Sequence, residues 1–215
     1  MISALARASA IDLTSAWLGA PDRDRPSRRR ERAWVRAAQS GSHDGMEALF
    51  RAHWAPAHRA AFLIVHDAAA AEDIAQEAFL AAIRALDRFD RRRPFGPWLH
   101  RIVVNRAIDW SRARALRREV GEPVDGEAPP QQPVGWSDEV VAALATLDPD
   151  QRAAVVLRHL LEYTPGEIAQ LLELPRGTVN SRLRRALDRL AAELEPPSGA
   201  RTTSPPGAAS REERP

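Results

Sequence analysis

The sequence predicts an all-α protein of two small helical domains joined by a flexible linker, with disordered tails. Two long segments are rich in Ala, Leu and Arg, and their apolar residues recur at helical steps of three and four. No segment shows the alternation of β-branched residues that is typical of strands. Pro and Gly gather between the two helical segments, where they indicate a linker.

Composition divides the 215 residues into five segments. Residues 1–32 end in a Pro-interrupted basic run and are expected to form a disordered basic extension. The first helical domain is expected over 33–116, the linker over 117–136 and the second helical domain over 137–195. The last segment, 196–215, is a low-complexity tail that we expect to be disordered.

Several classes of function are disfavoured by the composition. The chain has no Cys, which excludes disulfides, a thiol nucleophile and Cys-bound zinc within it. His53 and His58 are five residues apart, and no His-x-x-x-His pair places two imidazoles on one helix face, so no metal site is expected. No apolar run reaches the ~18 residues of a membrane span, and the N-terminus is a poor signal peptide. We therefore expect a cytoplasmic protein without membrane insertion, cofactor or catalytic residues.

Within the first domain, residues 70–88 are expected to form a helix with two different faces. Its apolar stripe consists of Ile74, Ala78, Ala82, Ile83 and Leu86. Its other side carries an acidic edge of Asp73, Gln76, Glu77 and Leu80. From these residues alone a solvated helix face is the simplest interpretation. Catalysis is disfavoured because no His or nucleophile is nearby.

The next helix is expected within Pro94–Arg114, with Pro97 near its start. An apolar stripe contains Trp98, Ile102 and Val103. A polar face is formed by Arg101, Asn105, Asp109 and Arg112. Aromatic residues close to Arg and Asn are typical of single-stranded DNA binding. A core role for Trp98 and Trp110, with a solvated polar face, fits the pattern equally well.

In the second domain, Leu147-Asp148-Pro149 is expected to end one helix and start another. Thr164-Pro165-Gly166-Glu167 has the order of a capping box, with Thr as N-cap, Pro at the first position and Glu at the third. Pro175 then restarts the chain. The buried stripe of the last helix is expected to contain Val179, Leu183, Ala186, Leu187, Leu190 and Leu194.

A helix of about two turns, a short turn and a basic helix together form helix-turn-helix geometry. The start of the second helix in this motif enters the major groove. Five Arg face one acid, Asp188, between Arg176 and Arg189, while the rest of this half is acidic. That charge distribution favours an anion-binding face. Candidates for contacts with base edges are Asn180, Ser181 and Arg184. A basic amphipathic helix without a DNA role is the alternative.

Both halves of the chain resemble the extracytoplasmic-function sigma factors, the compact two-domain members of the bacterial sigma-70 family. DIAQEAFLAAI is similar to region 2.2 of that family, and PFGPWLHRIVVNRAIDWSR is similar to regions 2.3 and 2.4. The stretch LDPDQRAAVVLRHLLEYTPGEIAQLLELPRGTVNSRLRRALDRL is similar to region 4. The resemblance covers residues 46–114 and 137–195, and the order of the two blocks makes it far more specific than a lone helix-turn-helix.

This resemblance implies an RNA polymerase sigma factor that is not an enzyme, binds core polymerase and recognises the −10 and −35 promoter elements. The residues implied for the β′ clamp helices of the polymerase are Asp73, Gln76, Glu77 and Leu80. Those implied for the −10 element are Trp98, Arg101, Asn105, Asp109 and Arg112. Those implied for the −35 element are Arg176, Thr178, Asn180, Ser181, Arg182, Arg184 and Arg185. The second domain is also expected on the β flap, and an anti-sigma factor is a common further partner.

Three residues depart from the usual pattern of the family. Asn180 stands where Lys is frequent, Glu173 stands at a turn position often held by Gly, and Pro97 stands where a small residue is usual. If Glu173 adopts a left-handed conformation, it costs ~1 kcal/mol relative to Gly.

Two alternative functions use the same residues differently. A stand-alone helix-turn-helix regulator would use the first domain for dimerisation or sensing and would bind a palindromic site without polymerase. A helical metal-dependent hydrolase would need clustered ligands, which the sequence lacks.

Overall fold

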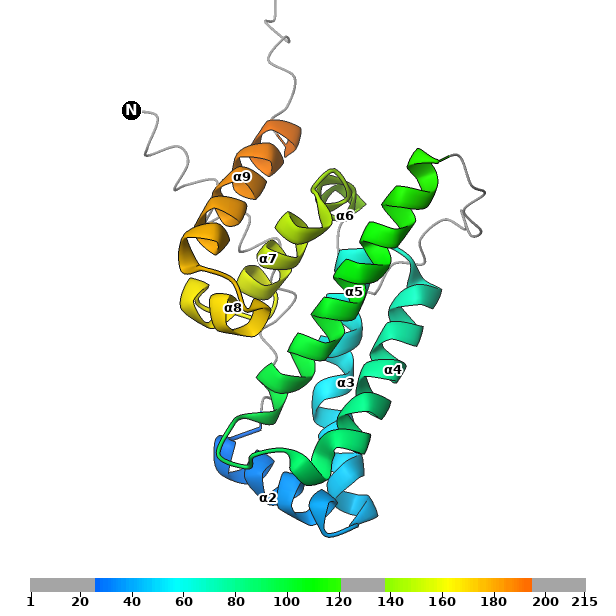
Figure 1. Ribbon diagram of the computed structural model, residues 1–215, viewed down its shortest axis with the longest axis vertical. Coiled ribbons are helices and arrows are strands. Elements are labelled where there is room, and N and C mark those ends of the chain that lie inside the picture. The colour runs from blue at the N-terminus through cyan, green and yellow to red at the C-terminus, as the bar shows by residue number, and fades with distance from the viewer. Residues whose placement is uncertain (1–25, 121–137, 195–215) are drawn as a thin grey trace, which may run out of the picture.

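A computed structural model describes residues 26–120 and 138–194, and every regular element in these ranges is a helix (Figure 1). The all-α prediction is thus confirmed for the described residues. An N-terminal block (residues 26–120) contains α2 (Arg28–Gln39), α3 (His43–Val65), α4 (Ala68–Ala85), the short 3-10 helix η1 (Leu86–Arg88) and α5 (Phe95–Glu119). A C-terminal block (residues 138–194) contains α6 (Asp138–Ala145), α7 (Pro149–His159), α8 (Pro165–Leu172) and α9 (Arg176–Leu194). The predicted start of the linker at residue 117 is wrong, because α5 continues to Glu119, while the rest of the linker and the predicted tail lie outside the described residues.

Helix α3 is the centre of the N-terminal block. It packs against α2, α4 and α5, and Figure 1 shows α3, α4 and α5 running alongside one another, with α2 across one end. Ala57, Ala60 and Ala61 of α3 are fully buried, and their small side chains allow the neighbouring helices to approach closely. The next four residues, 62–65, are also buried, so the end of α3 is covered on all sides.

Helix α2 is anchored by a buried carboxylate. Glu31 is only 7% exposed and accepts hydrogen bonds from the amides of Phe95 and Gly96, both at 3.2 Å, at the start of α5. Its Oε1 also lies 3.0 Å from Nε2 of His53. Burial acts to raise the pKa of Glu31, but the hydrogen bond and charge of His53, together with the two amides, lower it below its ordinary value.

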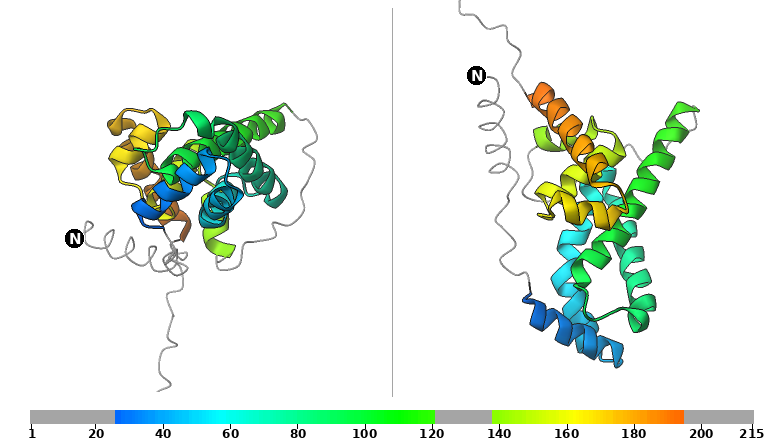
Figure 2. Two further views of the ribbon diagram at one scale, coloured as in Figure 1. Left: turned by 90° about the horizontal axis from the view of Figure 1, so that it is seen from below. Right: turned by 60° about the vertical axis from the view of Figure 1, so that its left-hand side comes forward.

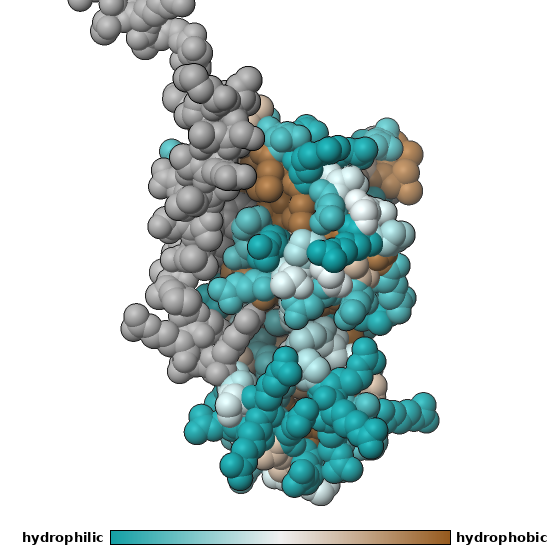
Figure 3. Space-filling model, turned by 90° about the vertical axis from the view of Figure 1, so that its left-hand side faces the viewer, coloured by the Kyte–Doolittle hydropathy of each residue, from teal (hydrophilic) through white to brown (hydrophobic). Residues whose placement is uncertain are grey.

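The outer face of α2 is strongly basic, and hydrophilic side chains cover this end of the molecule in Figure 3. Its exposed arginines are Arg28, Arg29, Arg30, Arg32 and Arg36. The prediction of disorder over residues 1–32 is wrong for its last part, because α2 begins at Arg28. The arginine run has the composition of a disordered segment, but contacts of Glu31 with residues 64 and 65 positions away hold it as a helix. Residues 1–25 lie outside the described ranges.

Helix α4 confirms most of its predicted apolar stripe. Its stripe residues Ile74, Ala78 and Ala82 are buried, and so is Leu86 at the start of η1. Ile83 was placed in the same stripe, but that prediction is wrong because its side chain is 45% exposed. Ile83 follows Ala82 by about 100° around the helix, which carries it past the edge of the buried face.

Helix α3 ends at His66, which adopts a left-handed conformation with φ 54°. The His66 amide donates to the carbonyl oxygen of Phe62 at 2.8 Å, which closes the last turn. Burial of the imidazole, followed by the charge of Arg152, lowers the pKa of His66 to about 3. The folded chain therefore holds His66 neutral at pH values where the unfolded chain binds a proton.

We expect the free energy of unfolding to decrease as the pH falls below about 6.5, because the unfolded state then binds more protons at His66. This contribution reaches at most about 1.4 kcal/mol per pH unit and continues until the folded form also protonates. His66→Asn is a matched variant, because Asn tolerates the left-handed conformation but does not titrate. Urea unfolding at about pH 7.5 and about pH 5 should show a smaller acid-induced loss in the variant. Equal losses in both proteins would contradict the assignment.

The C-terminal block follows the local signals of its sequence. Helix α6 ends at Ala145 and α7 begins at Pro149, which confirms the predicted helix break. The predicted capping box is also confirmed: the Thr164 hydroxyl accepts from the Glu167 amide at 3.3 Å, and the Glu167 carboxylate accepts from the Thr164 amide at 2.8 Å. These bonds satisfy two backbone donors at the start of α8.

The two blocks pack directly against each other. Helix α7 contacts α3 and α5, α8 contacts α5, and the buried apolar residues of both blocks form one continuous core. Figure 2 shows this contact from two further directions. One side chain buried at the junction is Arg152 of α7, which is 8% exposed and donates to the carbonyl oxygen of Ile64 in α3 at 2.5 Å. The sequence predicted a flexible linker between the blocks and therefore gave no reason to expect this contact.

Candidate nucleic-acid interface

Helices α8 and α9 meet at a tight turn. Glu173 follows α8 in a left-handed conformation with φ 54°, and the amide of Leu174 donates to the carbonyl oxygen of Ala169 at 2.9 Å. Glu173 therefore adopts the left-handed conformation that the sequence left open, and this conformation costs ~1 kcal/mol relative to Gly. Helix α9 then begins at Arg176. The amide of Thr178 in its first turn donates to the carbonyl oxygen of Pro175 at 2.9 Å.

Helix α9 has one buried and one basic face. Val179, Leu183, Ala186 and Leu190 are buried, while Leu187 and Leu194 of the predicted stripe are half-buried. The exposed side chains in its first three turns include Arg176, Asn180, Arg184 and Arg185. This face presents guanidinium and amide groups, which can bind phosphates and base edges.

Three further candidates on α9 are less accessible. Thr178, Ser181 and Arg182 are half-buried. The Ser181 hydroxyl donates to the carbonyl oxygen of Thr178 at 2.9 Å, so it has no second proton to donate elsewhere. Nη1 of Arg182 lies 3.1 Å from Oδ1 of Asp150, at the start of α7.

The polar face of α5 contains the residues predicted for it. Asn105, Asp109 and Arg112 are exposed, and Arg101 is partly covered. Nη2 of Arg101 lies 2.5 Å from Oε1 of Glu173, and Nη2 of Arg112 donates to both carboxylate oxygens of Asp150 at 2.8 Å. Both arginines therefore have carboxylate partners in the C-terminal block.

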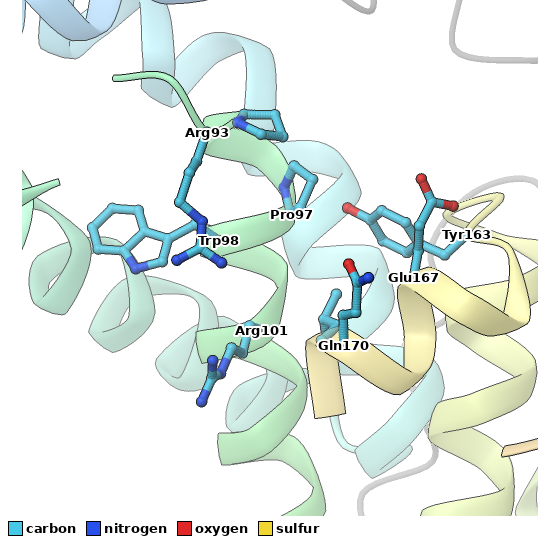
Figure 4. A pocket seen from close by; sticks show the side chains of 9 residues that line it. Arg93, Pro97, Trp98, Arg101, Tyr163, Glu167 and Gln170 are labelled. Carbon is cyan, nitrogen blue, oxygen red and sulfur yellow. The ribbon is translucent and has the colours of Figure 1, made fainter. Parts of the chain in front are cut away.

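Trp98 combines the two roles that the sequence left open. Its ring packs against Phe89 and Phe95, with centroids 4.5 Å and 5.6 Å away, yet the residue is only half-buried. Together with Arg93 and Pro97 it lines a hollow whose other wall includes Tyr163, Glu167 and Gln170 of the C-terminal block (Figure 4). The exposed part of the indole is a surface on which a base can stack.

The acidic edge of α4 lies on a different surface. Asp73, Gln76, Glu77 and Leu80 are all exposed, as the pattern predicted. Two of them have side-chain partners within the block: Glu77 pairs with Arg106 of α5 at 2.5 Å, and Gln76 donates to Glu72 at 3.1 Å. A carboxylate edge beside an exposed Leu is suited to a protein partner that is basic and partly apolar.

Sequence reasoning did not predict that two large apolar residues of the N-terminal block are exposed. Phe50 of α3 is 43% exposed and packs against Phe79 of α4 at a centroid distance of 5.1 Å, and Ile83 is exposed one turn after Phe79. The periodicity of α4 did not predict the exposure of Ile83, because its neighbour Ala82 belongs to the core. The exposure of Phe50 follows from helix geometry, because Phe50 points about 100° away from its buried neighbour Leu49.

Among the described residues, no group of three or more His, Asp or Glu is arranged to hold a metal ion. No helix in those same ranges is long and apolar enough to cross a membrane.

Family models match both blocks of the chain. The model described as "Sigma-70 region 2" matches residues 49–117, and the model described as "Sigma-70, region 4" matches residues 137–190. The first match contains α4 and most of α5, and the second contains the α8–α9 motif.

Named relatives agree with these matches. The chain is 34% identical over 158 residues to ECF RNA polymerase sigma factor SigM of Mycobacterium tuberculosis, which covers 72% of this chain and 80% of the relative. It is 32% identical over 150 residues to ECF RNA polymerase sigma factor SigW of Bacillus subtilis, covering 60% of this chain and 76% of the relative.

Solved structures give the same result. CnrH in complex with the cytosolic domain of CnrY is similar with a TM-score of 0.59 at 30% identity, covering 75% of this chain and 95% of that chain. The sigma factor RpoE from Bartonella quintana, in complex with the anti-sigma factor NepR, is similar with a TM-score of 0.58 at 25% identity. That match covers 69% of this chain and 95% of the other.

Proposed function

This chain belongs to the extracytoplasmic-function (ECF) sigma factors of the sigma-70 family, and we propose that three of its surfaces have separate roles in binding the promoter and the polymerase. The chain is an RNA polymerase sigma factor: it binds core polymerase and directs transcription initiation. In our proposal α9 reads the −35 element, α5 opens and reads the −10 element, and α4 binds the core. The observation that carries this division is the separation of a basic, an aromatic–polar and an acidic surface on three helices.

Helix α9 is our candidate for the −35 element. In a helix-turn-helix the start of the second helix lies in the major groove, which here places Arg176, Thr178 and Asn180 nearest the bases. Arg184 and Arg185, a little over a turn further along, are exposed and can reach phosphates or guanine. Ser181 and Arg182 belong to the same segment, with Arg182 free to contact DNA only after it leaves Asp150. Asn in place of the frequent Lys at position 180 favours adenine over a phosphate as its partner.

Arg184→Ala and Arg185→Ala are expected to weaken DNA binding and to reduce its salt dependence. Removing one phosphate contact makes the slope of log K against log salt shallower by about 0.9, because fewer counterions are released. Arg189→Ala is a matched control, since Arg189 is exposed on the same helix but lies beyond the first three turns. Binding of the polymerase-bound chain to a promoter fragment, measured over a salt series, tests this. An unchanged slope in either variant would remove that residue from the phosphate interface.

Helix α5 is our candidate for the −10 element. Trp98 offers an aromatic surface for an unstacked base, while Arg101 and Arg112 offer charges for the DNA backbone. Asn105 and Asp109 lie between these arginines on the same exposed face and supply donors and acceptors for base edges. This combination suits a strand whose bases have left the duplex, because stacking and backbone contacts do not require a groove.

The acidic edge of α4 is our candidate for the core polymerase. Asp73, Gln76 and Glu77 present acceptors to a basic partner, and Leu80 adds apolar contact area. We assign the β′ clamp helices to this edge and the β flap to the C-terminal block. The proposed site of action is the cytoplasm, where the polymerase works, and the role is recognition rather than catalysis. An anti-sigma factor is a further partner we propose, because the similar RpoE structure contains one.

Run-off transcription with sigma-free core polymerase and a promoter library tests the function. The chain should produce transcripts that core polymerase alone does not produce, and the chain should be recovered with the β′ subunit. A stand-alone helix-turn-helix regulator would instead bind a palindromic site tightly without polymerase. Absence of any sigma-dependent transcript across the library, together with such binding, would overturn the proposal.

A further inference from the structure

Helix α5 is capped at its start by a side chain from α2. A helix leaves four backbone positions without intrahelical amide bonds in its first turn. Two of these positions in α5 are Pro94 and Pro97, which have no N–H to donate. The other two, Phe95 and Gly96, donate to the carboxylate of Glu31, one to each oxygen, at 3.2 Å. A residue 64 positions before Phe95 thus accepts from both amides that this turn leaves unpaired.

The Glu31 carboxylate is itself held in place. Its Oε1 lies 3.0 Å from Nε2 of His53, and both side chains are buried. Gly96 leaves room for this arrangement, because a Cβ at that position would lie 3.1 Å from Cε1 of His53. Burial acts to raise the pKa of Glu31, but His53 and the two amides keep it below its ordinary value, so the cap is an anion at neutral pH. An anion is favoured at the start of a helix and forms strong hydrogen bonds with amides.

Helix α2 also holds the segment that leads into α5. Nε2 of Gln39 donates to the carbonyl oxygens of Leu86 at 2.8 Å and Phe89 at 3.0 Å. Nη2 of Arg32 donates to the carbonyl oxygen of Arg92 at 3.3 Å. Together with the cap, side chains of α2 therefore hold the connection between α4 and α5 at its beginning, middle and end.

These contacts converge on Trp98. The indole packs against the rings of Phe89 and Phe95, with centroids 4.5 Å and 5.6 Å away. Gln39 holds the backbone of Phe89, and Glu31 holds the backbone of Phe95. Both of these aromatic neighbours, which orient the indole, are thus anchored to α2.

We infer that Glu31 and Gln39 are positioning residues for promoter opening, which hold Trp98 in the orientation where a base released from the duplex can stack on it. The inference rests on the proposed role of α5, and it goes beyond that role by assigning part of it to two residues of α2 outside the proposed DNA-binding set. A stacking surface that is already ordered binds more tightly, because less conformational entropy is lost on binding.

Separate parts of a promoter test the inference with polymerase that contains this chain. One probe is a single strand with the −10 block of a promoter from the run-off library, and the other is a duplex with its −35 block. Glu31→Gln keeps the side-chain volume but loses the charge and one acceptor oxygen, while Gln39→Ala removes two hydrogen bonds. Each variant should bind the single strand at least about fivefold more weakly, as for one impaired base stack, and should bind the duplex within about twofold of the wild type.

General electrostatics predict the opposite result for Glu31→Gln. Removal of a negative charge strengthens the attraction of the chain for DNA phosphates, so a loss of −10 affinity would come from positioning and not from charge. Ile64→Val is the control for a loss of packing alone, because it removes a buried methyl group near the other end of α3. This control should bind both probes like the wild type.

A double-mutant cycle with Trp98→Ala identifies the route of the effect. If Glu31 acts through Trp98, Glu31→Gln should cause no further loss of −10 affinity once the indole is absent. The full loss in the Trp98→Ala background would overturn the inference. Wild-type affinity of both Glu31→Gln and Gln39→Ala for the single strand would also overturn it.

Amide hydrogen exchange in the free chain reports on the cap without DNA. Phe95 and Gly96 should exchange faster in Glu31→Gln than in Ile64→Val, and equal exchange in the two variants would overturn the role of the cap. Failure of the wild-type chain to bind the −10 strand would instead count against the proposed function of α5, while the exchange rates would still report on the cap.

Discussion

Replacing Arg152 by Ala is expected to lower the free energy of unfolding by about 4 kcal/mol, the largest stability effect we expect from one side chain. Arg152 is almost completely buried and donates to four carbonyl oxygens: Ile64 at 2.5 Å, Leu144 at 2.8 Å, Ala145 at 3.1 Å and Leu147 at 2.8 Å. The substitution removes the guanidinium donor from all four acceptors, of which Ile64 and Leu144 keep a second donor, and it opens a cavity between the blocks.

Arg152 is charged in the folded chain despite its burial. Burial lowers its pKa to about 10, against the opposing effect of Asp148, so the guanidinium remains protonated at neutral pH. Arg152→Lys keeps a charge but loses the planar fork and should recover only part of the stability. Urea unfolding followed by circular dichroism measures both variants, with Arg36→Ala on the exposed face of α2 as control. A decrease below about 1 kcal/mol in Arg152→Ala would contradict the role of this residue at the junction.

Asp73→Arg is expected to weaken binding to core polymerase by about tenfold or more, because it places a cation opposite a surface that we propose is basic. Asp73 is exposed and the structure gives it no partner within the described residues, so the variant should fold normally. Asp44→Arg makes the same change of charge on an exposed residue of α3, outside both proposed polymerase surfaces, and should bind like the wild type.

Titration of labelled chain with core polymerase gives the two dissociation constants, and circular dichroism confirms that both variants are folded. Glu77→Arg is less suitable, because it would also remove the ion pair with Arg106. If Asp73→Arg binds core polymerase as tightly as Asp44→Arg does, the polymerase surface of the N-terminal block does not include Asp73.

The features that sequence predicted well are local. The capping box at Thr164 depends on two residues three positions apart, and the helix break before Pro149 depends on adjacent residues. The buried stripe of α9 repeats at steps of three and four, so periodicity alone located Val179 and Leu183. The sequence marked Glu173 as a departure from Gly at this turn but left open whether the residue is left-handed, which the structure shows it to be.

The features that sequence could not predict join distant residues. Arg152 and Ile64 are 88 positions apart, and Arg101 and Glu173 are 72 positions apart, so no local pattern links them. The linker composition suggested independent blocks, while the contact between them depends on how α7 and α8 fit against α3 and α5. The start of α2 was missed for the same reason, since Glu31 finds its partners at the start of α5.

Mapping transcription start sites with purified polymerase that contains this chain tests the central claim most directly. The account predicts that the start sites share two upstream sequence blocks at a fixed spacing. Variants of α9 such as Asn180→Ala should change the requirement at the −35 block alone, and variants of α5 such as Asn105→Ala should change it at the −10 block alone. Start sites without shared blocks, or variants of both helices that alter the same block, would contradict the account.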